Sequence, residues 1–141
     1  MPTIIDVHIA PLALFKGDPQ FRPISDGIED GTIRVVYGGR LTREYNKIQE
    51  VMRRIATLDR AGRALLVDGV DAQEEVLTNS NACVSDDQHI IALAQLSGAR
   101  LLCSFDQLLH SDFTNKKLLD KPRGKVYQDT SHAKLIGVLG R

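Results

Sequence analysis

Residues 85–106 constrain the fold more strongly than any other part of the chain. Their pattern predicts a helix over residues 86–96, a tight turn and a buried apolar strand over residues 100–104. Asp87 opens the helix and Asp106 follows the strand. In an α/β protein these two points can lie at the same edge of the sheet, where active sites form at the carboxyl ends of parallel strands. Two acids there suggest a metal site.

Strands and helices alternate along the rest of the chain. We expect strands at residues 2–9, 32–37, 64–67, 100–104 and 125–128, and helices at residues 40–58, 71–77, 86–96, 107–113 and 131–138. Pro11 is expected to stop the first strand, and the proline-broken segment 17–31 to hold at most a short helix over residues 25–30. Strands separated by helices require crossover connections. The sequence therefore predicts one α/β domain, residues 1–141, with a largely parallel sheet.

The composition is that of a globular protein. Of the 141 residues, 43% are hydrophobic and 26% are charged, which argues against disordered and fibrous architectures. Cys83 and Cys103 lie among apolar neighbours without metal-ligand spacing, so we expect buried reduced thiols and a cytoplasmic protein. The first segment has no basic leader, and no stretch is long enough to span a bilayer.

Charge is distributed in blocks, although the formal net charge is zero. Residues 40–63 contain seven basic residues and three acids, and residues 116–141 contain seven and two. Residues 64–99 contain six acids and no Lys or Arg. A polyanion can therefore approach the basic blocks of a neutral molecule.

Two further acids occupy positions where a carboxylate needs an explanation. Asp6 follows two isoleucines in the first predicted strand, where Asp is normally depleted; its alternative role is to begin the turn toward Pro11. Glu44 continues an apolar helical stripe, since residues four, seven and eleven positions further on are Ile, Val and Ile. It therefore faces the sheet, unless its side chain reaches water from the first turn of the helix, where the dipole also favours an acid.

Asp87 and Asp106 have a simpler alternative role in helix capping. Residues 85–88 and 104–107 both match the capping box, so each acid could merely stabilise the start of a helix. Asp87 shares the apolar face of its helix and points toward the sheet, whereas Asp86 faces elsewhere and is better suited to capping.

Two other acids compete for inclusion in the site. Asp68 is left out because Asp68-Gly69 is ordinary turn chemistry. Asp112 lies in the short helix expected after Asp106 and is kept as a possible additional member.

Convergence of Asp6, Glu44, Asp87 and Asp106 would require a counter-charge. Two carboxylates about 4 Å apart repel by roughly 4 kcal/mol at an effective dielectric near 20. A hard divalent cation removes that cost, and Mg²⁺ or Mn²⁺ prefers oxygen ligands and retains several waters. Such an ion activates a bound water and stabilises charge on a phosphodiester oxygen. The chemistry implied is phosphodiester hydrolysis.

The chain resembles the PIN-domain family of compact α/β metal-dependent ribonucleases. The resemblance is clearest at residues 87–94, with the pattern D-x-x-I-x-A-x-A, and at Ser104-Phe105-Asp106 after the apolar strand. Elsewhere it extends to Asp6 at the end of the first strand and Glu44 early in the central helix. The family usually has Asn or Ser two residues after the first acid, where this chain has His8, and the segment 17–31 matches no family pattern.

The resemblance implies a three-layer α/β/α fold and a specific set of functional residues. Asp6, Glu44, Asp87 and Asp106 would be the catalytic acids and the ligands of Mg²⁺ or Mn²⁺. Ser104 would support the site, and RNA would be the substrate. Apart from the resemblance, Asp112 is a further candidate for support, and Arg40 and Arg43 of the first basic block are candidate contacts to single-stranded RNA. Many family members are toxins of toxin–antitoxin pairs and many form homodimers, so an antitoxin protein and a second copy are possible partners.

A non-catalytic PIN-like module that binds RNA or protein remains the alternative function. The basic blocks fit both functions, but a module that only binds RNA gains nothing from carboxylates that face phosphates. The four histidines share no metal spacing and are expected to be surface or packing residues. No glycine-rich phosphate loop is present, which argues against a Rossmann cofactor site.

Overall fold

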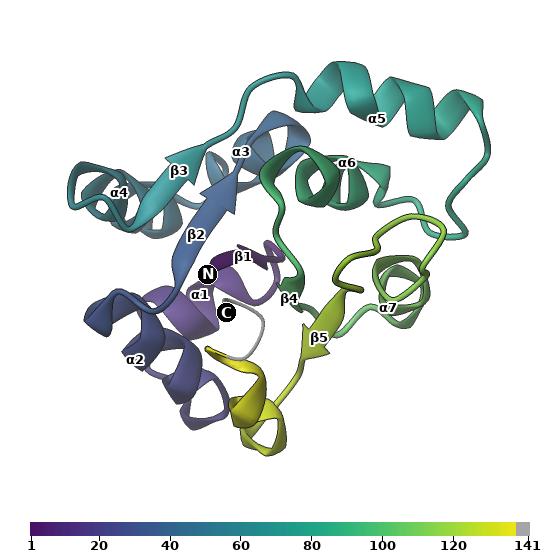
Figure 1. Ribbon diagram of the computed structural model, residues 1–141. Coiled ribbons are helices and arrows are strands. Elements are labelled where there is room, and N and C mark those ends of the chain that lie inside the picture. The colour runs from purple at the N-terminus through teal and green to yellow at the C-terminus, as the bar shows by residue number, and fades with distance from the viewer. Residues whose placement is uncertain (138–141) are drawn as a thin grey trace.

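The computed structural model describes residues 1–137 and contains a five-stranded sheet that is parallel throughout (Figure 1). The strands are β1 (Pro2–Ile5), β2 (Arg34–Tyr37), β3 (Ala64–Leu66), β4 (Leu101–Cys103) and β5 (Lys125–Tyr127), in the spatial order β3-β2-β1-β4-β5. The predicted α/β fold with a central, largely parallel sheet is therefore confirmed.

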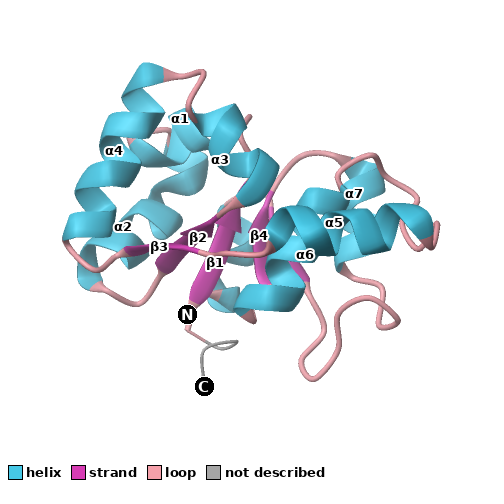
Figure 2. Ribbon diagram, turned by 90° about the horizontal axis from the view of Figure 1, so that it is seen from above, coloured by secondary structure: helices cyan, strands magenta, loops and turns pink. Residues whose placement is uncertain are grey.

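Helices cover both faces of this sheet. They are α1 (Ala10–Leu14), α2 (Arg22–Asp30), α3 (Gly39–Tyr45), α4 (Gln49–Arg60), α5 (Val70–Asn79), α6 (Gln88–Ser97) and α7 (Gln107–Phe113), with 3-10 helices η1 (Pro19–Phe21) and η2 (Thr130–Leu135). Figure 2 shows α1, α2 and α4 on one side of the strands and α5 and α6 on the other. This arrangement is the expected three-layer α/β/α architecture.

The central position of β1 follows from its burial. Thr3, Ile4 and Ile5 are fully buried, as expected of a parallel strand covered by helices on both faces. Thr3 pairs with Val35 of β2 on one side and with Leu101 of β4 on the other. The residues that follow β1 and β4 therefore emerge side by side at the carboxyl edge of the sheet.

The helix predicted over residues 40–58 is wrong in one respect, because it is two helices. α3 ends at Tyr45, and α4 begins after Ile48, whose backbone is extended. The break shifts the phase of the apolar stripe. The intervals of three and four residues from Tyr45 through Ile48 place Met52 in the stripe of a continuous helix, but in α4 Met52 is exposed and its neighbour Val51 is buried. The predicted apolar spacing assumed one continuous helix, whereas the turn between α3 and α4 changes which residues of α4 face the core.

Two segments that contain prolines also differ from expectation. The first strand ends at Ile5, and Pro11 lies in the first turn of α1, where its missing N–H is not needed by the helix. Pro23 occupies the same position in α2, which runs over nine residues instead of the short helix expected at 25–30.

The terminal segment forms the 3-10 helix η2 rather than an α-helix, and Val138 lies outside the described residues.

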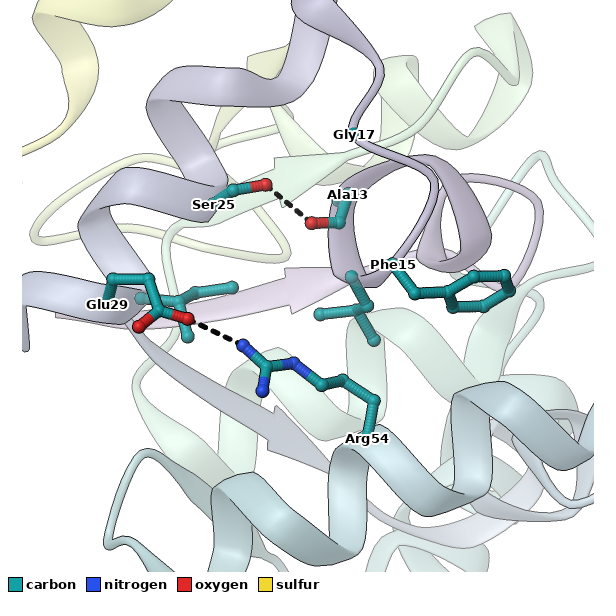
Figure 3. A pocket seen from close by; sticks show the side chains of 8 residues that line it. Ala13, Phe15, Gly17, Ser25, Glu29 and Arg54 are labelled. Atoms are coloured by element: carbon teal, nitrogen blue, oxygen red, sulfur yellow. Dashed lines mark hydrogen bonds and ion pairs between the residues drawn. The ribbon is translucent and has the colours of Figure 1, made fainter.

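A cavity of about 200 Å³ separates α1, α2 and α4 (Figure 3). Arg54 of α4 pairs with Glu29 of α2 at 2.7 Å across it, and the Ser25 hydroxyl donates to the Ala13 carbonyl at 2.6 Å. None of the predicted acids lines this cavity, so its contacts join helices rather than form part of the candidate site.

Two further expectations concern the state of the cysteines and the presence of membrane-spanning helices in residues 1–137. Both cysteines are free thiols; Cys103 is buried, and Cys83 is only partly buried. Across this part of the chain, every helix is too short or too polar to cross a membrane.

Candidate active site

Asp6 and Asp106 lie at the ends of the adjacent strands β1 and β4, joined by Ser104. Asp6 is 8% exposed, and its backbone N–H donates to the Cys103 carbonyl at 3.0 Å, which extends the ladder by one bond. The Ser104 hydroxyl donates to Asp6 Oδ2 at 2.8 Å and accepts from the Asp106 N–H at 3.1 Å. Ser104 thus fixes the orientation of one acid and the backbone of the other.

Asp106 also caps a helix, as its alternative role required. Its Oδ1 accepts from the backbone N–H groups of Leu108 and Leu109 at 3.0 and 3.2 Å, at the start of α7. Both bonds use the same oxygen. Capping therefore accounts for one half of the carboxylate and fixes its position at the edge of the sheet.

Asp87 does not cap its helix, and its carboxyl faces other acids. It occupies the N-cap position of α6 without a capping bond from its side chain. Burial, together with the nearby carboxylates of Asp6 and Asp106, raises the pKa of this carboxyl to about 6, although Arg40 opposes the shift. The simple capping role is wrong for Asp87. Three of the four predicted acids are instead close enough to influence one another electrostatically.

Glu44, on α3, is the fourth acid and is held by a buried histidine. Burial raises the pKa of its carboxyl, and so does Asp6, whereas Arg40, His8 and Lys47 lower it. His89, 2% exposed, has its Nε2 3.1 Å from Glu44 Oε1.

The protonation of His89 follows from its second neighbour. Arg40 Nε donates to His89 Nδ1 at 3.1 Å, and a guanidinium can only donate, so Nδ1 is the acceptor. Nε2 therefore carries the hydrogen and donates it to Glu44. Burial, together with Arg40 and Arg43, lowers the pKa of His89 to about 3, so the ring is neutral at physiological pH.

Arg40 and Arg43, the candidate RNA contacts, are both occupied by protein groups. Arg40 donates to the Asp86 carbonyl at 2.7 Å and lies 3.6 Å from Glu74 and 3.8 Å from Asp87. Arg43 makes two bonds of 3.0 Å to Asp71. Arg40 therefore stabilises the arrangement of the site by contacting His89 and the start of α6. An RNA would have to displace Asp71 to bind Arg43.

Asp112 supports the loop before α6 rather than the acid cluster. It is 2% exposed, and its two oxygens accept from the N–H groups of Val84 and Ser85, each at 2.9 Å. The Ser85 hydroxyl in turn accepts from the Asp87 N–H at 3.2 Å. Asp112 therefore positions Asp87 indirectly, through the backbone and hydroxyl of Ser85.

The donor set suits a hard divalent cation, although the side chains do not converge on one point. Within residues 1–137, no three His, Cys, Asp or Glu side chains are close enough together to hold a metal ion as they stand. Mg²⁺ is usually held by one or two carboxylates, with waters completing the octahedron. Asp6 and Asp106, adjacent and oxygen-only, could supply that minimum. The metal role of the four acids stays a prediction.

Comparison with models of protein families, with curated protein sequences and with solved structures found no match.

Sequence reasoning missed the role of His89. It was expected to be a packing or surface residue like the other histidines, and it is buried, but its two ring nitrogens join Arg40 to Glu44. One signal was available. His89 lies two residues after Asp87 and directly before the apolar run Ile90–Ala94 of its helix, where a polar side chain needs an internal partner.

Proposed function

We propose that this protein is a Mg²⁺- or Mn²⁺-dependent ribonuclease that hydrolyses RNA phosphodiester bonds at the carboxyl edge of its sheet. One observation carries the proposal. Asp6 and Asp106 meet across Ser104 at the carboxyl ends of β1 and β4, and Glu44 of α3 and Asp87 at the start of α6 lie near enough for these acids to raise their pKa values. Mutual repulsion and burial make this arrangement costly unless a cation or a proton compensates it.

Each residue has a separable part in this activity. Asp6 and Asp106 would bind the ion, with Ser104 holding the Asp6 carboxylate in one orientation. Glu44 and Asp87 would accept protons or bind metal-coordinated waters, and His89 keeps Glu44 turned toward the site. The bound ion would activate a water and stabilise charge on the phosphodiester oxygens. The resemblance of residues 85–113 to PIN-domain ribonucleases supports the same chemistry.

The direct test is cleavage of single-stranded RNA by purified protein. We expect cleavage with Mg²⁺ or Mn²⁺ and none with excess chelator. The Asp6→Asn and Asp106→Asn variants should lose at least about 100-fold in activity, because removing one electrostatic partner of a transition state typically costs that much. Glu75→Gln changes an exposed carboxylate of α5 and serves as the matched control.

Two outcomes would reject the ribonuclease. One is unchanged cleavage by both Asn variants, which would indicate a contaminating nuclease. The other is tight RNA binding without metal-dependent cleavage, which would favour the non-catalytic RNA-binding module. The possible roles as a toxin, with an antitoxin partner, and as a homodimer depend on the resemblance alone.

A further inference from the structure

A groove adjoins the acid cluster on the side of α3. It has a volume of about 380 Å³ and is lined by Val7, His8, Pro11, Glu44, Lys47 and Ile48. Glu44 belongs both to this groove and to the cluster, so the groove opens onto the candidate active site. Its volume falls within the usual range of small-ligand sites, roughly 300–1,000 Å³.

The lining of the groove divides into an apolar part and a cationic part. Val7 and Ile48 are half-buried and pack against the hydrophobic core, and Pro11 lies beside them in the first turn of α1. His8 and Lys47 are exposed at its margin. Both lie near enough to Glu44 to lower the pKa of its carboxyl, so their charges are next to the acids.

Lys47 differs from the two arginines that precede it in the sequence. Arg40 and Arg43 are both engaged by carboxylates. Lys47 forms no ion pair with any carboxylate in residues 1–137, and it lies in the turn that ends α3, where its N–H donates to the Glu44 carbonyl at 3.2 Å. It is therefore a cation beside the acids that an anionic ligand can engage without breaking a protein contact.

We infer that this groove is the subsite for the nucleotide next to the scissile phosphate of a single-stranded RNA. Lys47 would contact the flanking phosphate as a point charge, with His8 as a second donor at the margin. Val7, Pro11 and Ile48 would contact the sugar and base, since single-stranded chains expose the apolar faces of their bases. The inference rests on the proposed function, because it takes the acids to be the point of cleavage.

Binding and cleavage by charge variants of Lys47 test the subsite. Anisotropy of a short labelled single-stranded oligoribonucleotide is measured in chelator, across a series of salt concentrations, for the wild type, Lys47→Ala and Lys47→Arg. Lys117→Ala, which removes an exposed lysine of the loop after α7, is the control. Loss of one phosphate contact should reduce the slope of log K against log salt by about 0.7 for a single strand.

We expect that reduced slope for Lys47→Ala only, with recovery in Lys47→Arg. In cleavage with Mn²⁺, Lys47→Ala should raise KM several-fold with little change in kcat, because the contact is to a non-reacting phosphate. A nucleoside monophosphate should compete with the oligonucleotide better than inorganic phosphate does, since only the former has a base for the apolar part of the groove.

The result distinguishes this inference from the proposed function. If Lys47→Ala and Lys117→Ala have the same salt slope and KM while metal-dependent cleavage persists, the subsite is wrong and the ribonuclease stands. If Lys47→Ala alone weakens binding but no variant cleaves RNA, the groove binds nucleotides and the proposed hydrolysis is wrong. Equal competition by phosphate and the nucleoside monophosphate would reject the apolar part of the subsite.

Discussion

Asp112 and Asp87 are two acids connected through the same loop, yet their surroundings are opposite. Asp112 is enclosed and has both oxygens on backbone N–H groups. Asp87 lies against Asp6 and Asp106, with Arg40 at 3.8 Å as its nearest cationic partner. Hydrogen bonds from backbone N–H groups to a carboxylate, as at Asp112, stabilise a fold. Carboxylates close to one another, as around Asp87, repel and reduce its stability.

The difference separates structural acids from functional ones. A buried carboxylate with both oxygens on backbone N–H groups already has its charge compensated, and it can hold the loop that positions another acid. A carboxylate that faces carboxylates has an unfilled requirement for positive charge. Perturbed acids of the second kind concentrate at functional sites. The following changes test whether Asp112 and Asp87 differ in this way.

The largest effect on stability is expected from Asp112→Ala. This change leaves the N–H groups of Val84 and Ser85 without their acceptors in a buried position. We expect the free energy of unfolding to fall by about 3 kcal/mol, measured by urea denaturation. Glu75→Ala, at an exposed position of α5, should change it by less than about 0.5 kcal/mol. Equal effects of the two changes would contradict an anchoring role for Asp112.

Substitution of His89 should act mainly on activity. His89→Ala removes the hydrogen-bond donor that orients Glu44, and loss of such a supporting partner typically costs about 10- to 100-fold in metal affinity or activity. His89→Gln can retain a donor and should recover part of the loss. Activity is measured across Mn²⁺ concentrations at a temperature where each variant is folded. If Ala and Gln variants have the same metal dependence, His89 only fills space.

Asp87→Asn should stabilise the protein while inactivating it. The folded-state pKa of Asp87, about 6, lies above the ordinary value of 3.8, so the folded protein binds more protons than the unfolded chain between these limits. The stability of the wild type attributable to this group is therefore complete below about pH 4 and is lost as pH rises through 6. In chelator, the variant should gain about 1 kcal/mol over the wild type at pH 7.

The gain from Asp87→Asn should disappear at about pH 3, below both pKa values, where the wild-type carboxyl is protonated in the folded and the unfolded state. Chemical denaturation at the two pH values measures this. A variant less stable than the wild type at pH 7 would show that Asp87 is a structural acid like Asp112.

The smallest effect is expected from Arg43→Ala. Arg43 and Asp71 are both largely exposed, and exposed pairs contribute about 0.2–1 kcal/mol. We expect a loss of stability within that range and little change in RNA cleavage, since the guanidinium is held by Asp71. A several-fold rise in KM for RNA would instead support the contact that sequence reasoning assigned to Arg43.

Local patterns predicted most of the fold, and long-range contacts supplied the rest. The parallel sheet followed from alternating apolar strands and helices, and residues 107–113 formed the helix expected there. The break between α3 and α4 did not follow, because the apolar spacing runs on across Asn46 and Lys47 and only tertiary packing reveals the change of phase.

The candidate site was predictable in its residue types but not in its contacts. Strand ends and inward helix faces drew attention to four acids, which the structure brings near one another and whose role in a site stays a prediction. The sequence could not show that Asp112 would bind the loop before α6, or that Arg40 would bind a histidine 49 positions away instead of a substrate. Such pairings depend on how helices dock, which no local pattern contains.

The location of bound Mn²⁺ tests the central claim most directly. Crystals grown with Mn²⁺ and measured near its absorption edge should give an anomalous peak within about 2.0–2.6 Å of a carboxylate oxygen of Asp6 or Asp106. The peak should be absent from the Asp106→Asn variant under the same conditions. Metal-dependent RNA cleavage by the wild type, combined with an ion bound elsewhere or with none at these acids, would contradict the account.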